Sequence, residues 1–235
     1  MRLKFLGTRG YIEEKNKWHS KHSSLLVNGR VLFDWGKTWK GKLNKLKPKV
    51  IFITHAHPDH AGGLTSDIKL PVYASGECFR QLKKLSLTNL REIKPGRVVS
   101  QEGLKIMPYK VTHSLLAPAV GYRVSDGKAV FVYNPDIISI EKKNKILKGV
   151  NLYIGDGATL KRSLVRRKGK KIFGHAAIST QVNWCRHFSI KKAIFTHFGK
   201  GAVEMNEKSL KRRLREFGEK EVEVVAAYDG MTIEE

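Results

Sequence analysis

Acidic residues are scarce in this sequence. Its 235 residues include 45 Lys and Arg against only 21 Asp and Glu, which gives a formal net charge of +24 and a pI near 10.1. A positive field of this size attracts polyanions, and it predicts nucleic acid as the partner. The alternative is a solvated basic surface with no dedicated partner.

Long apolar runs and paired cysteines are also missing. No apolar run approaches the length that spans a membrane, and residues 1–6 have the pattern of a strand rather than of a signal peptide. Cys78 and Cys185 are not spaced as a metal-binding pair, so we predict a reducing, cytoplasmic environment, with a disulfide as the alternative. Without a linker or an internal repeat, we expect a single domain over residues 1–235.

The stretch Thr-His-Ala-His-Pro-Asp-His at positions 54–60 carries the densest chemistry of the chain. It follows the apolar run 50–53, which is typical of a buried strand that ends in a loop. The first two histidines are two positions apart, so an extended backbone directs both to the same side. Imidazoles and a carboxylate are ligands for zinc, manganese or iron, and their number predicts two metal ions. The ligand-type residues are His55, His57, Asp59 and His60.

The motif at positions 55–60 resembles the signature of the metallo-β-lactamase-fold hydrolases. Later segments extend the resemblance over nearly the whole chain, and the opening Leu6-Gly7-Thr8 resembles that of tRNase Z-like members. The resemblance implies an α/β fold, a four-layer αββα sandwich with metals at one edge between its two sheets.

The resemblance also implies a full set of metal ligands. The first ion would be held by His55, His57 and His113, and the second by Asp59, His60 and His197. Asp136 would bridge the two ions, although this chain has Pro135-Asp136 where family members usually have Gly-Asp. We therefore expect two divalent ions per chain, Zn²⁺ or Mn²⁺, with Fe²⁺ as the alternative. We further expect Asp34, which follows a predicted strand, to cap or buttress the metal loop.

Two later segments, Asp156 and Gly174-His175, resemble the acidic and Gly-His segments of tRNase Z-like phosphodiesterases. There the histidine is associated with the scissile phosphate and the leaving group. A carboxylate that is hydrogen-bonded to an imidazole fixes its tautomer and favours its protonated form, as a general acid requires. The predicted catalytic residues are therefore His175, Asp156 and Asp59, the last of which would orient a hydroxide that bridges the metals.

Cations gather close to these motifs. The run 161–171 predicts contact with a phosphate backbone, unless it forms a solvated basic helix. Its cations are Lys161, Arg162, Arg166, Arg167, Lys168, Lys170 and Lys171. In the polar segment 11–22, His19 and His22 are candidate contacts to a substrate phosphate or to an extra metal, with ordinary loop histidines as the alternative.

Turn residues predict two hairpins, one around Asn28-Gly29 and one around Asp126-Gly127. Short helices are predicted over residues 37–49, 76–85, 141–148 and 203–216.

Together these features predict a dinuclear metal-dependent hydrolase, first of all a phosphodiesterase or nuclease that cleaves DNA or RNA with a metal-bridging hydroxide. The alternatives are a small-molecule hydrolase acting on a cyclic phosphodiester, thioester or lactone, and a non-catalytic binding or redox module. Redox diiron members usually have Glu in place of the second signature histidine, so His57 argues against the last. The tRNA-gripping arm of bacterial tRNA-processing members lies between the third histidine and the bridging Asp. His113 and Asp136 are only 23 positions apart, which leaves no room for that arm.

Overall fold

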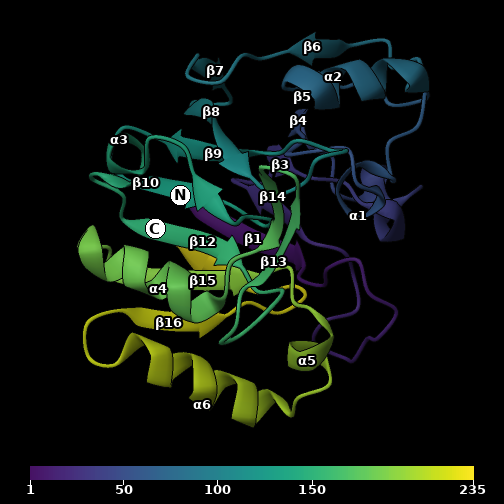
Figure 1. Cartoon of the computed structure of the whole chain (residues 1–235). Coiled ribbons are helices and arrows are strands. Elements are labelled where there is room, and N and C mark those ends of the chain that lie inside the picture. Colours follow the sequence, from purple (N-terminus) through teal and green to yellow (C-terminus); the bar gives the residue numbers. More distant parts are fainter.

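Two β-sheets face each other across the main hydrophobic core. The computed structural model describes all residues from 1 to 235 (Figure 1). The first sheet has the strand order β17-β1-β2-β3-β4-β5-β6. Its strands are β1 (Arg2–Gly7), β2 (Ser24–Val27), β3 (Val31–Phe33), β4 (Val50–Phe52), β5 (Val72–Ala74), β6 (Leu90–Glu92) and β17 (Thr232–Glu234).

The second sheet has the order β11-β8-β9-β10-β12-β15-β16, and β7 pairs with β8. Its strands are β7 (Val99–Gln101), β8 (Leu104–Thr112), β9 (Val120–Ser125), β10 (Val130–Tyr133), β11 (Ser139–Ile140), β12 (Leu152–Asp156), β15 (Lys192–Thr196) and β16 (Glu223–Ala226). A separate two-stranded sheet consists of β13 (Leu164–Lys168) and β14 (Lys171–His175).

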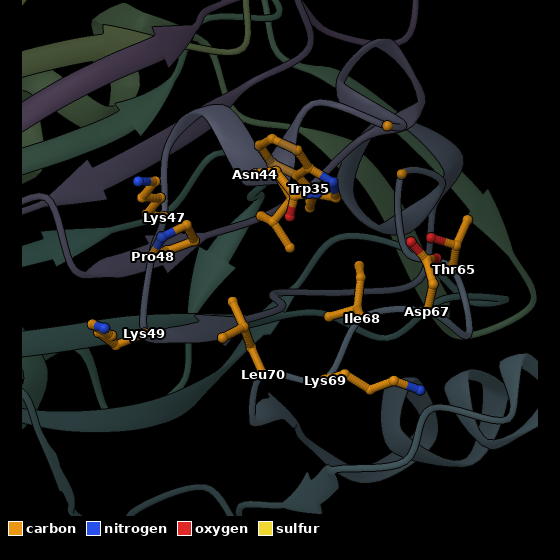
Figure 2. A pocket seen from close by; sticks show the side chains of 13 residues that line it. Trp35, Asn44, Lys47, Pro48, Lys49, Thr65, Asp67, Ile68, Lys69 and Leu70 are labelled. Carbon is orange, nitrogen blue, oxygen red and sulfur yellow. The ribbon is translucent and has the colours of Figure 1, made fainter.

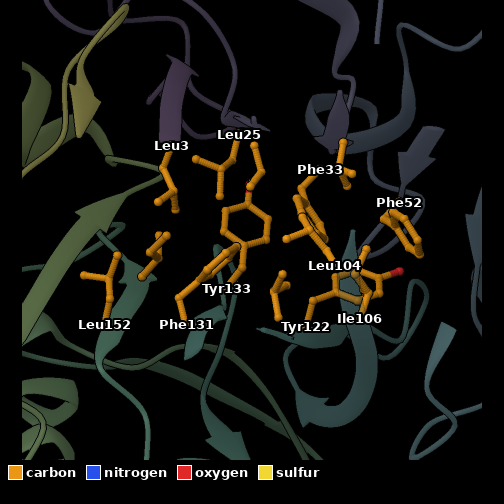
Figure 3. Close-up of a cluster of buried hydrophobic side chains, with 14 of the residues drawn as sticks. Leu3, Leu25, Phe33, Phe52, Leu104, Ile106, Tyr122, Phe131, Tyr133 and Leu152 are labelled. Carbon is orange, nitrogen blue, oxygen red and sulfur yellow. The ribbon is translucent and has the colours of Figure 1, made fainter. Parts of the chain in front are cut away.

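Alternating apolar side chains explain why both faces of each sheet are covered. In β2, Leu25 and Val27 lie in the core between the sheets, whereas Leu26 packs into a separate core on the outer face. Aromatic rings fill the space between the sheets, and Phe33 packs against Phe131 of the opposite sheet with ring centroids 6.3 Å apart. Figure 3 shows this core from the side, with strands of the two sheets contributing from opposite directions.

Helices cover both outer faces, which confirms the predicted four-layer αββα sandwich. The core of the outer face of the first sheet includes residues of α1 (Pro58–Ala61) and α2 (Gly76–Leu82), and that of the second includes residues of α3 (Lys143–Leu147), α4 (Ile178–His187), α5 (Lys200–Val203) and α6 (Glu207–Gly218). In Figure 1, α4 and α6 lie at one side of the molecule and α1 and α2 at the other. None of these helices combines the length and the apolar character that crossing a membrane requires.

Most predicted elements are present. Asn28 and Gly29 both have positive φ, as their hairpin turn requires. The helix predicted over 37–49 is wrong, because the chain forms two 3₁₀ turns, Lys37–Trp39 and Leu43–Lys45, separated by Gly41 at φ +73°. The basic run 161–171 is not a helix either, since it forms most of the β13–β14 hairpin.

The carboxyl ends of parallel strands meet at one edge, and this arrangement creates the site. Strands β3, β4, β5 and β6 are mutually parallel, as are β10, β12, β15 and β16. The residues at or just beyond these strand ends are Asp34 after β3, His55 after β4, Asp136 after β10, Asp156 at the end of β12 and His197 after β15.

Candidate metal centre

Three of the predicted ligands form a first group of imidazoles. His55 Nε2 lies 2.9 Å from His57 Nδ1, and His113 Nε2 lies 3.5 Å from the same atom. One ring nitrogen from each residue falls within a sphere that a single ion could occupy. His55 and His113 are buried, and burial lowers the pKa of both imidazoles. Neutral imidazoles of this kind are ready to bind a metal.

The remaining predicted ligands form a second, fully buried group: Asp59, His60, Asp136 and His197. Asp136 Oδ2 lies 2.6 Å from His60 Nε2 and 3.3 Å from His197 Nε2. Its Oδ1 lies 3.6 Å from His113 Nε2, in the first group. Asp136 therefore contacts both groups, which is the position that the sequence analysis predicted for a bridging carboxylate. We call these seven residues the metal centre.

Outer partners orient the imidazoles. Asp34 Oδ2 lies 2.9 Å from His60 Nδ1, Thr54 Oγ1 lies 3.0 Å from His55 Nδ1, and the Gly174 carbonyl lies 3.0 Å from His113 Nδ1. Each of these contacts occupies Nδ1 and directs Nε2 inward, the usual arrangement around a bound metal. The expected buttressing role of Asp34 is confirmed by this contact.

The metal centre fits divalent cations. Asp59 Oδ1 is buried and makes no hydrogen bond, although an unpaired polar atom of this kind is costly. Burial raises the pKa of Asp136, but His197 and other neighbouring histidines outweigh it and hold this pKa well below its usual range. In turn, burial lowers the pKa of His197, but Asp136 and further carboxylates raise it to about 10. The ionised carboxylates thus balance their charge with imidazolium protons, which a divalent cation would displace.

His175 and Asp156 lie beside the metal centre. His175 Nδ1 is 2.7 Å from Asp156 Oδ2 and 3.3 Å from Asp136 Oδ1. Asp156 is itself fixed, because its Oδ2 accepts from the Ile137 backbone at 3.0 Å and its Oδ1 from the Ala158 backbone at 2.8 Å. Burial lowers the pKa of His175, but Asp156 outweighs it and the net pKa is raised. An oriented imidazole whose protonated form is favoured therefore lies next to the ligands.

The two histidines of the N-terminal loop differ. His19 is fully buried, with Nδ1 2.8 Å from Thr8 Oγ1 and its ring against Phe198, so the prediction that it contacts substrate is wrong. His19 is buried because it packs against an element distant in sequence, which no local pattern indicates. His22 instead lines a surface cavity of about 580 Å³, together with Arg9, Tyr11, Ile12, Glu13, Lys37 and Thr38. Burial lowers the pKa of His22 to about 4, so it is neutral.

A second cavity, of about 550 Å³, lies on the outer side of the first sheet (Figure 2). Trp35, Lys47, Lys49 and Asp67 are among its lining residues, and none of the residues of the metal centre lines it. It offers no convergent set of catalytic groups.

The supporting contacts of three residues were not predicted by the sequence analysis. Gln181 bonds both the backbone N–H and the carbonyl of Asp156, Thr54 bonds His55, and Gly174 bonds His113. Thr54 adjoins the histidine motif and could have been found there. Gln181 and Gly174 act across long sequence separations, which no local pattern reveals.

The chain is similar to known proteins in sequence. Residues 30–198 match the family model described as "Beta-lactamase superfamily domain". The chain is 27% identical to Ribonuclease Z of Methanopyrus kandleri over 175 residues, which cover 64% of this chain and 61% of that protein. Such alignments span about half to two thirds of the length of the first archaeal relatives.

Solved structures share the fold. The metallo-beta-lactamase fold protein YhfI from Bacillus subtilis superimposes with a TM-score of 0.73 at 16% identity, covering 100% of this chain and 99% of that one. A diphosphatase from the PhnP family superimposes with a TM-score of 0.69 at 19% identity, covering 99% and 97%. At these identities the likeness establishes the fold.

Proposed function

Since the chain belongs to the beta-lactamase superfamily, we propose that it is a metal-dependent hydrolase that cleaves phosphodiester bonds in nucleic acid with two divalent ions. The observation that carries this proposal is the position of His175. Its imidazole is held by Asp156 at 2.7 Å and stands 3.3 Å from Asp136, the carboxylate that contacts both ligand groups. Hydrolysis of an ester with a poorly stabilised leaving oxygen needs such a positioned proton donor.

The residues have distinct roles in this proposal. His55, His57 and His113 would hold one ion, Asp59, His60 and His197 would hold the other, and Asp136 would be shared. Bound divalent ions supply Lewis acidity and lower the pKa of a coordinated water to about 7.

The chain's own groups supply orientation and protons. Asp59 Oδ2 contacts His60 at 3.2 Å and His197 at 2.9 Å, which leaves the buried Oδ1 free to accept a hydrogen bond from the attacking water. His175 keeps Nδ1 on Asp156, so its Nε2 can deliver a proton to the leaving oxygen. The buried surroundings strengthen each of these electrostatic contacts.

Charge and similarity support nucleic acid as the substrate. The net charge of +24 favours a polyanion over a small neutral ester. The similarity to Ribonuclease Z points the same way. The alternative is hydrolysis of a small molecule, such as a cyclic phosphodiester, a thioester or a lactone.

End-labelled single-stranded RNA and DNA test the proposal. The protein is stripped of metal, refilled with Zn²⁺ or Mn²⁺, and assayed beside an Asp59→Ala variant. The substrates are both polymers, bis(p-nitrophenyl) phosphate, a thioester and a lactone. We expect cleavage of at least one polymer that needs metal and is lost in Asp59→Ala. Turnover of a thioester or a lactone without cleavage of any phosphodiester would overturn the proposal, and turnover of the small diester alone would restrict it to small substrates.

A further inference from the structure

The β13–β14 hairpin and its preceding turn, residues 161–175, form an exposed projection that we call the arm. No acidic residue occurs between positions 157 and 203. Three of the four other Lys and Arg residues of that interval, Arg186, Lys192 and Lys200, each contact a carboxylate. The seven cations of the arm make no ion pair and no side-chain hydrogen bond, and all seven are exposed. Their charge is therefore available to a ligand.

The pairing register places a like-charged pair at the tip. Lys168 lies directly opposite Lys171, and like charges in this position destabilise a hairpin. An anion between the two side chains would remove this repulsion. The tip is thus a second indication that the arm receives a negatively charged partner.

Apolar side chains alternate with these cations. Arg166 is paired with Phe173 and Arg167 with Ile172, and the members of each pair share a face of the hairpin. Leu164 and Val165 are 54% and 48% exposed. Neither Phe173 nor Ile172 packs into any of the three hydrophobic cores, and Phe173 contacts no other aromatic ring. A surface that needed only to hold phosphates would have no use for these side chains.

The root of the arm contacts the metal centre. The Gly174 N–H donates to the His113 carbonyl at 2.7 Å, and His113 Nδ1 donates to the Gly174 carbonyl at 3.0 Å. The next residue is His175. In Figure 1, β13 and β14 lie side by side as a separate hairpin. A polymer bound along the arm would therefore reach the metal ligands and the proposed proton donor.

We propose that the arm is a clamp for single-stranded nucleic acid, with phosphates on its cations and unstacked bases against Phe173 and the neighbouring apolar side chains. Bases of a duplex are stacked on each other and present no face to such side chains, whereas those of a single strand do. This inference rests on the proposed function, since it deepens the identity of the substrate that the metal centre receives.

Binding of a short fluorescein-labelled, non-hydrolysable 2′-O-methyl phosphorothioate oligonucleotide tests the clamp. Anisotropy is measured with metal-loaded protein over a series of salt concentrations, for the single strand and for its duplex. Co-sedimentation measures binding of the same proteins to phosphatidylserine vesicles. The variants are R166A/R167A/K168A and F173A, and R212A/R213A/R215A on α6 is the charge-matched control. Metal content and thermal unfolding report whether each variant is folded.

We expect the arm triple variant to bind the single strand at least about tenfold more weakly, and the slope of log K against log salt to fall by about 2, because each lost phosphate contact removes roughly 0.7. F173A should weaken single-strand binding about tenfold without changing that slope, since stacking releases no counterions. Duplex binding should not respond to F173A, and the α6 control should behave as wild type.

Three results would overturn the clamp. The first is that the arm triple variant and the α6 control bind the single strand with equal affinity. The second is that F173A weakens duplex binding as much as single-strand binding. The third is that the arm binds anionic phosphatidylserine vesicles but not the oligonucleotide. A different result would disprove the proposed catalytic activity. A wild-type protein that binds the single strand through the arm but cleaves no phosphodiester would disprove catalysis and leave the clamp standing.

Discussion

The metal centre and the arm differ in the burial and pairing of their side chains, although they contact each other through one residue pair. In the metal centre nearly every side chain is buried, and its imidazoles are oriented by a second group such as Asp34 for His60. In the arm every Lys and Arg is exposed and none has an ion-pair partner. Catalysis requires groups that are held rigidly away from water, whereas binding of a charged polymer requires side-chain charges that remain accessible to it. The contact between Gly174 and His113 joins the two.

The largest effect should come from removing the shared carboxylate. Asp136→Ala deletes the one group that contacts both sets of ligands, so we expect activity to fall by more than about 10⁴-fold, since each ion contributes several kcal/mol to the reaction. Metal content by mass spectrometry should fall with it. A variant that keeps two ions and full activity would show that Asp136 is not a shared ligand.

His175→Gln should separate proton donation from metal binding. We expect the rate on RNA or DNA to fall about 10²- to 10⁴-fold, because the leaving oxygen then departs without a proton. Hydrolysis of bis(p-nitrophenyl) phosphate should fall far less, since its phenolate leaves readily, and metal content should stay constant. Equal losses on both substrates would argue that His175 acts through the metal centre instead.

Asp34→Asn tests how strongly the outer partners matter. Asp34 accepts from the Thr54 backbone at 2.8 Å and holds His60 Nδ1 at 2.9 Å. An amide cannot accept at both atoms, so we expect metal affinity to fall about 10- to 100-fold. Competition with a chromophoric chelator measures this affinity. Wild-type affinity in Asp34→Asn would mean that packing alone orients His60.

The sequence predicts the metal centre better than the arm, and the reason is physical. The apolar run 50–53 and the adjoining motif indicate His55, His57, Asp59 and His60 through local pattern alone. The other three ligands were expected only from the family resemblance. The hairpin turn at Asn28-Gly29 is equally local. The fold of residues 161–175 depends on cross-strand pairing and on the bond from Gly174 to His113, which are distant in sequence. The burial of His19 likewise depends on Thr8 and Phe198.

Gly174→Ala should damage the junction between the two regions. Gly174 has φ +126°, and a Cβ there would collide with the Leu164 carbonyl oxygen. We expect a cost of about 1–3 kcal/mol, seen as faster proteolysis within residues 161–171 and weaker single-strand binding. Gly169→Ala is the matched control, because its φ of +58° lies in open space and should cost less. Equal protease resistance in both variants would mean that the root is not strained.

We expect the smallest effect from replacing the arm cations, measured as a change in thermal stability. Residues without partners lose no ion pair when they are replaced, and substitutions of this kind on a surface are usually nearly neutral. Removing three like charges from a chain of net charge +24 also relieves some repulsion. We therefore expect R166A/R167A/K168A to shift the Tm by no more than about 2 °C, while Asp136→Ala changes both the Tm and its response to added Zn²⁺. A large loss of Tm in the arm variant would mean that these cations hold the fold together. The contrast between the buried metal centre and the exposed arm would then fail, because the arm would also be needed for the stability of the fold.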